Sequence, residues 1–413
     1  MQLPASIKRV NTAIQTLKNG SMVVLLDHPD RENEGDLIMP AETITPEQMN
    51  FMIQHCSGIV CLPMMPDRLK KLNLDLMVPP HHNTSRYHTP FTVSIDARKS
   101  ITTGVSAQDR VNTIRVAINE RTVPDDLVRP GHIFPLQVRT GGTLERPGHT
   151  EGSVDLVKLA GFNPAAVLCE IMNKDGTMAK QSQLNRFAKK YHLPILYIED
   201  IIEYRLRHES MIEDIAVSSF PLEKYGSFKI SVIKEKISGA EHIVLTKPHK
   251  NQSKPTLVRI HSTCATGDLF ASRRCDCHQQ LHHALAAISE EGGMLIYLNQ
   301  EGRGIGLFNK IKAYTLQEKG LDTVEANLEL GLPIDSRKYY IAAHILRHYK
   351  IDHIRLLTNN PEKMADLYKY GISRINQVLM PAFHNEDNQH YLNTKKTKLK
   401  HAIHFKQGRK VET

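Results

Sequence analysis

The sequence lacks the features of a membrane-spanning or secreted protein. It has no run of about 18 apolar residues, and the N-terminal stretch MQLPASIKRVNTAIQ has no apolar signal-peptide core. Cysteine is also scarce, with six residues in 413, three of them clustered near residue 270. This usage argues against a disulfide framework and favours metal or thiol chemistry. We therefore expect a soluble, cytoplasmic protein without a membrane partner.

The sequence also lacks a concentrated nucleic-acid-binding motif. Its net charge is +9, which suits either nucleic acid or a phosphorylated small substrate. The basic residues are spread out except in NTKKTKLKHAIHFKQGRK, residues 393–410, which we interpret as a solvated basic tail. No aromatic-interleaved basic motif accompanies this run, so we expect no nucleic-acid partner. A basic zinc protein that binds RNA is the alternative, and a salt-dependent RNA affinity would support it.

The chain is long enough for two domains, and apolar strands alternate with helical patterns in both halves. We expect an α/β fold class with some α+β character, with two α/β domains in tandem at residues 1–206 and 216–413. The periodicity fades around RLRHESMIEDIAVSSFP, so residues 207–215 are expected to be a linker. One helix start is distinct, because Thr45 and Gln48 form a capping box around Pro46. The expected strands include MVVLL, FTVSI and AVLCEI in the first domain and TLVRIH, GMLIYL and IRLLT in the second.

An acidic loop in the first half, DHPDRENEGD, directly follows the strand MVVLL. Its closely spaced carboxylates are Asp30, Glu32, Glu34 and Asp36. Sites in α/β domains lie at the carboxyl ends of strands, and crowded carboxylates there bind hard cations or act as bases. His132 and His149 each follow a Pro-Gly turn near an arginine, and Thr103 and Gly104 lie in TTGVSAQDR. Together these residues suggest a metal-assisted sugar-phosphate site, although each alone fits a charged turn or a structural histidine.

The ordered motifs RENEGD, SGIVC, TTGVSAQDR, RPGHIFPL, GHTE and AVLCEI closely resemble 3,4-dihydroxy-2-butanone 4-phosphate synthase, over about residues 6–205. The resemblance implies that D-ribulose 5-phosphate is converted to 3,4-dihydroxy-2-butanone 4-phosphate and formate with Mg²⁺ or Mn²⁺. It implies that Glu32 and His149 hold the metal and that His132 and Glu170 act in catalysis. The implied substrate-binding residues are Arg31, Glu32, Asp36, Arg146 and Thr150. Residues 78–92 depart from the family pattern, and we interpret His81, His82 and His88 there as surface residues.

Three cysteines in the second half have the spacing of a metal site rather than of a zinc ribbon. Ten residues separate Cys264 from Cys275, and one separates Cys275 from Cys277. A closed structural zinc site needs four ligands, whereas three thiolates and a water make a catalytic one. The fourth position is either filled by a neighbour such as His278 or left open. Two further stretches, IYLNQEGRGIGL and RLLTNNPEK, place strand ends and helix starts where phosphate binds well.

The ordered motifs RIHSTCATGD, RCDC, QEGRGIGL, DTVEAN, LGLPIDSR and LLTNNPEK closely resemble GTP cyclohydrolase II, over about residues 216–400. The resemblance implies hydrolysis of GTP to 2,5-diamino-6-ribosylamino-pyrimidinone 5′-phosphate, formate and pyrophosphate. It implies Zn²⁺ on Cys264, Cys275 and Cys277 with an open fourth position, and Mg²⁺ with the GTP. Asp335 would accept a proton, Arg337 would be the nucleophile, and Tyr314 would lie near the zinc. The implied GTP-binding residues are Arg259, Gln280, Glu301, Arg303, Thr323, Thr358 and Lys363.

Three positions depart from that family pattern: Thr263 replaces Glu, His278 replaces Gly, and Asn299 replaces Arg.

The combined hypothesis is a bifunctional enzyme of riboflavin biosynthesis, a lyase and a hydrolase in one chain. The alternative keeps the first activity and makes the second half a degenerate domain that binds zinc or nucleotide or supports a dimer. The resemblance also implies a homodimer with the first site at the subunit interface.

Overall fold

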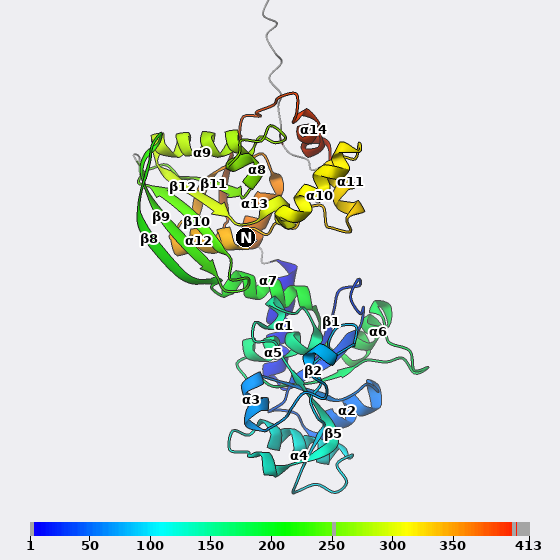
Figure 1. The fold of residues 1–413 in the computed structure, drawn as a ribbon. Helices are drawn as coiled ribbons and strands as arrows, with labels where there is room; N and C mark the ends of the chain where they lie inside the picture. Colours follow the sequence, from blue (N-terminus) through cyan, green and yellow to red (C-terminus); the bar gives the residue numbers. More distant parts are fainter. Residues whose placement is uncertain (1–3, 250–252, 399–401, 403–413) are drawn as a thin grey trace, which may run out of the picture. The chain divides into compact units, whose positions relative to one another are not determined.

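The computed structural model describes residues 4–249, 253–398 and 402 (Figure 1). The chain divides into two compact units, Met1–Arg205 and Leu206–Thr413, and the boundary falls within helix α7, Ile198–His208. Each unit contains its own sheet and helices, as expected for two α/β domains in tandem. Among the described residues, no helix is both long and apolar enough to cross a bilayer.

In the described part of the first unit, seven strands form one mixed sheet in the order β4-β5-β3-β6-β2-β1-β7. The strands are β1 Val23–Leu26, β2 Gly35–Pro40, β3 Cys61–Met64, β4 Ile95–Ala97, β5 Leu127–Gln137, β6 Ala166–Glu170 and β7 Ile195–Tyr197. The four central strands β1, β2, β3 and β6 are buried almost throughout, because helices and loops cover both faces. The expected strand FTVSI is wrong in extent, since Phe91 and Thr92 make isolated bridges and β4 begins at Ile95.

The helices of the first unit are α1 Ala5–Lys18, α2 Pro46–His55, α3 Pro66–Lys71, α4 Ala107–Ile118, α5 His149–Leu159 and α6 Gln181–Tyr191, together with the first part of α7. Short 3₁₀ turns lie at Pro80–His82, Pro124–Asp126 and Gly142–Leu144. The predicted capping box is confirmed: the Gln48 amide donates to Thr45 Oγ1, and Gln48 Oε1 accepts from the Thr45 amide. Helix α5 packs on β1, β2, β3 and β6, so its first turn lies beside the centre of the sheet.

In the described part of the second unit, another seven strands form a mixed sheet in the order β14-β13-β11-β12-β10-β9-β8. These are β8 Ile212–Leu222, β9 Gly226–Glu235, β10 Glu241–Lys247, β11 Thr256–Ser262, β12 Gly293–Leu298, β13 His353–Leu357 and β14 Arg374–Val378. The predicted linker at residues 207–215 is wrong as an irregular segment, because α7 runs to His208 and β8 starts at Ile212. Strand β8 lies at the sheet edge and pairs with β9 alone, so it carries little of the alternation that marks a strand in a sequence.

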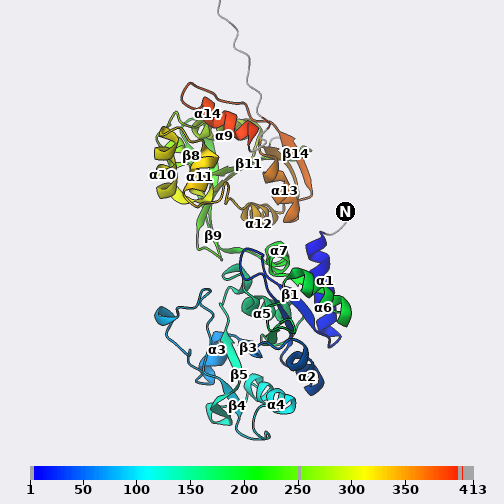
Figure 2. The same ribbon diagram turned by 90° about the vertical axis from the view of Figure 1, so that its right-hand side faces the viewer.

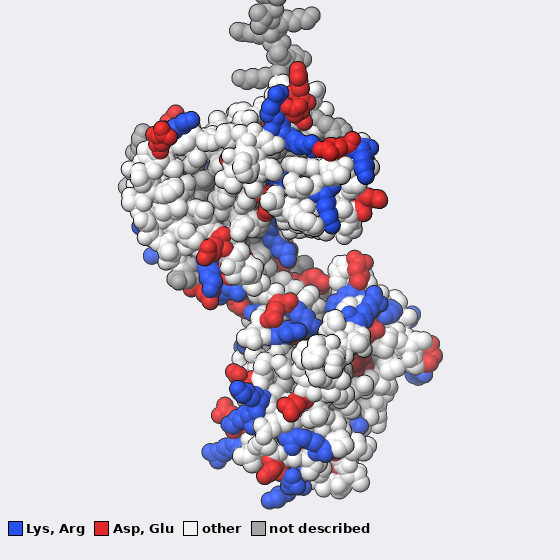
Figure 3. All heavy atoms as spheres, viewed as in Figure 1, with Lys and Arg blue, Asp and Glu red and all other residues white. Residues whose placement is uncertain are grey.

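The helices of the second unit are α8 Ala265–Asp268, α9 Cys277–Glu291, α10 Gly306–Glu318, α11 Thr323–Glu329, α12 Tyr340–His348, α13 Pro361–Lys369 and α14 Gln389–Thr397, with a 3₁₀ turn at Glu301–Gly304. Helix α9 packs on β11 and β12, and α11 contacts both α10 and α14 (Figure 2). Residues 393–397 of the predicted solvated tail belong to α14, and the prediction is wrong for Thr394, which is buried, and for Lys395, whose side chain is 12% exposed. Residues 399–401 and 403–410 lie outside the described part of the chain. On the face shown in Figure 3, acidic and basic side chains are interspersed rather than gathered by sign.

Two candidate active sites

The acidic loop between β1 and β2 is organised by Asp27, a residue that the sequence interpretation did not select. Asp27 is buried, and its two carboxylate oxygens accept the backbone amides of Glu32 at 2.9 Å and Glu34 at 2.8 Å. The Arg31 guanidinium donates to the same carboxylate at 3.0 Å. The loop is therefore folded around one buried acid, and this arrangement fixes where the Glu32 side chain begins.

Glu32 and His149 meet at the end of the sheet, as predicted for a metal site. His149 is the first residue of α5, and its Nδ1 lies 3.5 Å from Glu32 Oε2. Among the described residues, no hydrogen-bond partner reaches the buried Nε2 of His149. Asp27, Glu32 and His149 each place one ligand atom within 4.8 Å of the other two. Oxygen donors with one imidazole and an unsatisfied ring nitrogen fit a hard divalent cation such as Mg²⁺ or Mn²⁺.

Asp36 and Glu170 supply two further carboxyl groups beside this cluster. They are opposite residues of β2 and β6, and Glu170 Oε2 accepts the Ile59 amide at 2.8 Å. Burial raises the pKa of Asp36 to about 7, so near neutral pH this group can either donate or accept a proton. Burial opposes the charged form of His149, but Asp36 and Glu32 outweigh it and raise the pKa of His149 to about 9.

Two predicted substrate-binding arginines contact a loop that departs from the family pattern. Arg31 donates to Glu32 Oε2 at 2.7 Å, and Arg146 donates to Glu151 Oε2 at 2.7 Å. Tyr87 joins them, since its hydroxyl donates to the Arg31 carbonyl at 2.5 Å and its own carbonyl accepts from Arg146 at 3.1 Å. Thr150 is buried in the same first turn as His149. His81, His82 and His88 are exposed, in agreement with their interpretation as surface residues.

Among the described residues, His132 pairs with Asp96 and is not part of the group formed by Asp27, Glu32 and His149. Its Nδ1 is 2.7 Å from Asp96 Oδ2, and the imidazole is 42% exposed. Gly104 is needed beside this pair, because its φ is +90° and a Cβ there would come within 2.6 Å of His132 Nδ1. Asp96 holds the ring in one orientation and leaves Nε2 turned away from the ion pair.

The three cysteines of the second unit come together as predicted. Cys264 follows β11, whereas Cys275 and Cys277 precede and begin α9, and one sulfur from each lies within 4.8 Å of the other two. The Cys264 and Cys275 sulfurs are 3.7 Å apart. Tetrahedral zinc with Zn–S bonds of about 2.3 Å separates its sulfurs by about 3.8 Å, so this donor set fits zinc.

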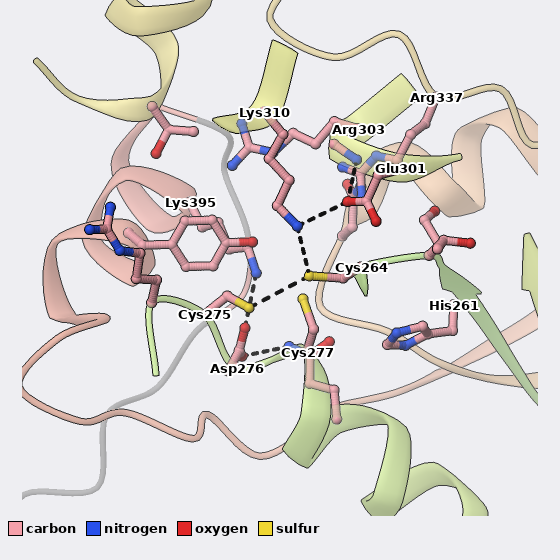
Figure 4. Close-up of a pocket in the computed structure, with 18 of the residues that line it drawn as sticks. His261, Cys264, Cys275, Asp276, Cys277, Glu301, Arg303, Lys310, Arg337 and Lys395 are labelled. Atoms are coloured by element: carbon pink, nitrogen blue, oxygen red, sulfur yellow. Dashed lines mark hydrogen bonds and ion pairs between the residues drawn. The ribbon is translucent and has the colours of Figure 1, made fainter. Parts of the chain in front are cut away.

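The surroundings of the cluster favour a thiolate at Cys264, whereas the neighbouring sulfurs and burial raise the pKa values of Cys275 and Cys277. Hydrogen bonds from the Cys275 and Cys277 thiols, together with the nearby Lys310 ammonium, lower the pKa of Cys264. Lys310 Nζ lies 3.1 Å from Cys264 Sγ and 2.9 Å from Glu301 Oε1 (Figure 4). Gly267 lies beneath the cluster, where an added Cβ would be 2.9 Å from Cys275 Sγ.

The cysteines line one pocket with all seven residues predicted to bind GTP, which are Arg259, Gln280, Glu301, Arg303, Thr323, Thr358 and Lys363. Tyr314 and Arg337, predicted to act in catalysis, line the same pocket. Asp335 does not line the pocket itself but accepts Arg337 Nε at 2.9 Å. Residues from β11, α9, the 3₁₀ turn, α10, α11 and α13 are thus gathered around one cavity.

Arg303 is a cation of this pocket whose terminal nitrogens have no hydrogen-bond partner among the described residues. It adopts a left-handed φ of +64° between Gly302 and Gly304. Both terminal nitrogens of its guanidinium are buried, and neither has a hydrogen-bond partner among the described residues. Buried donors without partners are costly, so this side chain is arranged for an acceptor that enters the pocket. A triphosphate supplies such acceptors.

Comparisons with known proteins agree with both halves of this description. The family model for 3,4-dihydroxy-2-butanone 4-phosphate synthase matches residues 11–204, and that for GTP cyclohydrolase II matches residues 213–378. Riboflavin biosynthesis protein RibBA of Aquifex aeolicus is 50% identical over 398 residues, covering 95% of this chain and 97% of that protein. The RibBA of Bacillus cereus strain AH187 is 48% identical over 398 residues, covering 96% and 99%.

The chain belongs to the RibBA family of riboflavin biosynthesis proteins. It is a bifunctional, metal-dependent enzyme, a lyase in its first half and a hydrolase in its second. This membership favours two activities over a degenerate second half. A solved two-domain 3,4-dihydroxy-2-butanone 4-phosphate synthase from A. baumannii, RibBX, has the same fold, with a TM-score of 0.65 at 32% identity. It aligns with 91% of this chain and with all of its own.

None of the three departures from the family pattern belongs to the described cysteine cluster, and one of them, Thr263, lines the pocket. Thr263 lines the pocket, and its hydroxyl donates to the Leu298 carbonyl at 2.8 Å. The Asn299 amide donates to His242 Nδ1 at 3.1 Å. The His278 ring lies 4.2 Å from that of His282, and His278 is not part of the described cysteine cluster. The fourth side of the cluster is therefore not closed by His278.

Several residues of the two sites were not found from the sequence. Asp27 is the first residue of the acidic loop DHPDRENEGD but was not selected as a candidate, and Lys310 belongs to no selected motif. Asp276 lies between two cysteines and was quoted only as part of RCDC. Tyr391 and Lys395 line the GTP pocket from a segment interpreted largely as tail. The sequence signal for this pair was an aromatic and a lysine four residues apart.

Proposed function

We propose that this RibBA protein carries out its two reactions at two metal sites with the following residue roles. The Glu32–His149 site converts D-ribulose 5-phosphate to 3,4-dihydroxy-2-butanone 4-phosphate and formate. The site at Cys264, Cys275 and Cys277 hydrolyses GTP. The observation that carries the proposal is the cysteine cluster, which shares one pocket with the unpaired guanidinium of Arg303.

At the first site, Glu32 and His149 would hold Mg²⁺ or Mn²⁺, which would polarise the substrate carbonyl when bound. Asp36, whose pKa burial raises to about 7, is placed to take and return a proton during enediol formation. Glu170 is directly across the sheet and provides a second carboxyl group for proton transfer. Arg31, Arg146 and Thr150 bind the sugar phosphate, and Arg146 also holds the covering loop through the Tyr87 carbonyl.

At the second site, the three cysteines would hold zinc, which would supply a nucleophilic water for the attack at C8 of guanine. Tyr314 lines the pocket beside Lys310 and positions groups around this end of the substrate. We propose Asp335 as the proton acceptor, and the likeness of this half to GTP cyclohydrolase II supports this role. We assign Arg337 the role of phosphate clamp, because a guanidinium with a pKa above about 12 is a poor nucleophile. Mg²⁺ would accompany the triphosphate.

We also propose a homodimer in which His132 of one subunit completes the first site of the other. Support comes from the described residues, among which His132 pairs with Asp96 and does not belong to the group formed by Asp27, Glu32 and His149. Mixing the inactive Glu32→Gln and His132→Ala proteins should then regenerate part of the first activity, because mixed dimers contain one intact site. A mixture that stays inactive while subunits demonstrably exchange would contradict the shared site.

Formate release from each substrate tests the two assignments together. EDTA should stop both reactions, and Mg²⁺ alone should restore formate release from ribulose 5-phosphate. Formate release from GTP should need Zn²⁺ as well as Mg²⁺. Recovery of the GTP reaction with Mg²⁺ alone, in protein shown to be free of zinc, would refute the role given to the cysteines.

A further inference from the structure

The C-terminal helix α14, Gln389–Thr397, contributes to the wall of the GTP pocket. Tyr391 and Lys395 are one helical turn apart, so they lie on the same face of the helix, and both line the pocket. The match to the GTP cyclohydrolase II model ends at residue 378, before this helix begins. The helix is therefore an addition to the part of the pocket that the family model describes.

Lys395 joins α14 to the loop that carries the cysteines. Its Nζ lies 3.1 Å from Asp276 Oδ1, between Cys275 and Cys277 in the sequence (Figure 4). The Lys395 side chain is 12% exposed and that of Asp276 is 2% exposed. Asp276 Oδ2 also accepts the Gln280 amide at 2.6 Å, so both of its oxygens are used. Burying an ammonium is costly, and a basic surface tail has no need to do so.

Tyr391 connects the same helix to the open arginine of the pocket. The Lys395 ammonium lies 4.2 Å from the centre of the Tyr391 ring, and the Arg303 guanidinium carbon lies 5.8 Å from it. Aromatic rings attract cations at these distances. Tyr391 therefore lies near two cations of the pocket, Lys395 and Arg303. The terminal nitrogens of Arg303 have no hydrogen-bond partner among the described residues.

Other contacts fix α14 against the rest of the unit. Leu392 is fully buried and Thr394 nearly so. On the side of α11, Lys398 pairs with Glu325 at 3.0 Å and with Asp322. A helix anchored at several points presents Tyr391 and Lys395 in defined positions and can form a lasting part of a binding site.

We propose that α14 is one wall of the GTP site, in which Lys395 binds the anionic nucleotide and Tyr391 positions Lys395 and Arg303 for that contact. The inference rests on the proposed assignment of this pocket to GTP. Lys395 contacts the nucleotide through its charge, since an ammonium is a compact donor for phosphate oxygens. The competing explanation is that Lys395 neutralises Asp276 and supports the cysteine loop without touching the substrate.

Equilibrium binding to the zinc-loaded, full-length protein separates these explanations. The probe is a fluorescent α,β-methylene analogue of GTP, measured by anisotropy. Lys395→Met should weaken binding by about ten- to a hundredfold, as expected for the loss of one charged hydrogen bond. Lys396→Met is the matched control, because it removes the same charge from an exposed neighbour in the same helix, and it should bind as wild type does. Tyr391→Phe, which keeps the ring, should bind nearly normally, whereas Tyr391→Leu should bind weakly.

Two further measurements complete the test. Zinc content and conversion of ribulose 5-phosphate should be unchanged in Lys395→Met, and the analogue should slow hydrogen exchange at the α14 amides of the wild type. Equal affinity of Lys395→Met and Lys396→Met, or loss of zinc from Lys395→Met, would overturn the inference and leave the GTP site itself intact. If the zinc-loaded wild type binds no analogue at all, the proposed function of the pocket fails, and the inference fails with it.

Discussion

The Glu32 carboxylate lies 3.5 Å from Nδ1 of His149, although Glu32 belongs to the β1–β2 loop and His149 begins α5. Each residue reaches this position through its own local structure. Asp27 folds the acidic loop by accepting two of its backbone amides, and Gly148 precedes the first turn of the helix. The other ring nitrogen of His149, Nε2, is buried and has no hydrogen-bond partner among the described residues. This nitrogen is therefore free to bind a metal ion at the end of the sheet.

Glu32→Gln is therefore expected to lower the formation of the ketone phosphate at least about a hundredfold, because hard cations bind weakly to neutral amides. Formate release from ribulose 5-phosphate measures the loss, and formate release from GTP should remain normal. Asp30→Asn is the matched control, since it makes the same change in the same loop at a side chain that is 92% exposed. Near-normal turnover of ribulose 5-phosphate by Glu32→Gln would mean that the loop is only a charged turn.

The cysteine cluster predicts about one zinc per chain, most of which Cys275→Ser should lose. With three protein ligands, the replacement of one soft thiolate by a hydroxyl is hard to compensate. Metal analysis of the purified variant gives the result directly, and its conversion of ribulose 5-phosphate shows whether the first unit is still folded. Full zinc occupancy in Cys275→Ser would remove this cysteine from the metal site.

Gly267→Ala should disturb the same cluster without altering any ligand. An added Cβ would lie 2.9 Å from Cys275 Sγ and 3.0 Å from Cys264 Sγ, closer than such atoms normally approach. The sulfurs must then move apart from the spacing of about 3.8 Å that zinc requires. We expect zinc affinity to fall by about tenfold or more, measured by competition with a chelator. Unchanged affinity would show that the loop adjusts to the methyl group.

Acid should weaken the second unit through His344. Burial, assisted by Arg347, lowers the pKa of His344 to about 4. Arg347 donates to Nδ1 at 2.8 Å, and Nε2 lies 2.7 Å from the Leu206 carbonyl, which suits a neutral ring. The pKa of an unfolded histidine is about 6.5, so this contribution is complete above that pH and is lost as the pH falls toward 4.

At pH 5 the loss amounts to about 2 kcal/mol of stability. Hydrogen exchange at the amides of α12, compared between pH 7 and pH 5 after correction for the intrinsic rates, measures the change in opening free energy. His344→Gln removes the titrating group and should show a smaller change over the same interval. An equally large change in both proteins would assign the acid sensitivity to other residues.

The residues of the two candidate metal clusters that the sequence analysis selected were marked by residue type and spacing. The cysteines at positions 264, 275 and 277 could be identified before the fold was known, and so could Glu32 in the acidic loop. The strands of the second sheet were also recognisable, since β10 to β13 are apolar runs between turns. Residue chemistry and short-range pattern are sufficient for features of this kind.

Other features depend on contacts between distant parts of the chain. Asp27 organises its loop by accepting backbone amides, which have no identity in a sequence. Lys395 is one of several lysines in its segment, and only the folded chain places it against Asp276 rather than in solvent. Strand β8 was missed for a similar reason, because an edge strand takes its structure from pairing with β9 rather than from an alternating pattern.

The division of the chain into two units, each with its own candidate metal cluster, has a consequence for metabolism. One translation event yields one centre of each kind, so the two centres are always made in equal numbers. The supply of the four-carbon precursor relative to the pyrimidine precursor is then governed by two turnover rates and two substrate pools, and not by separate expression of two enzymes. A mutation that slows one centre cannot be offset by making more of that centre alone.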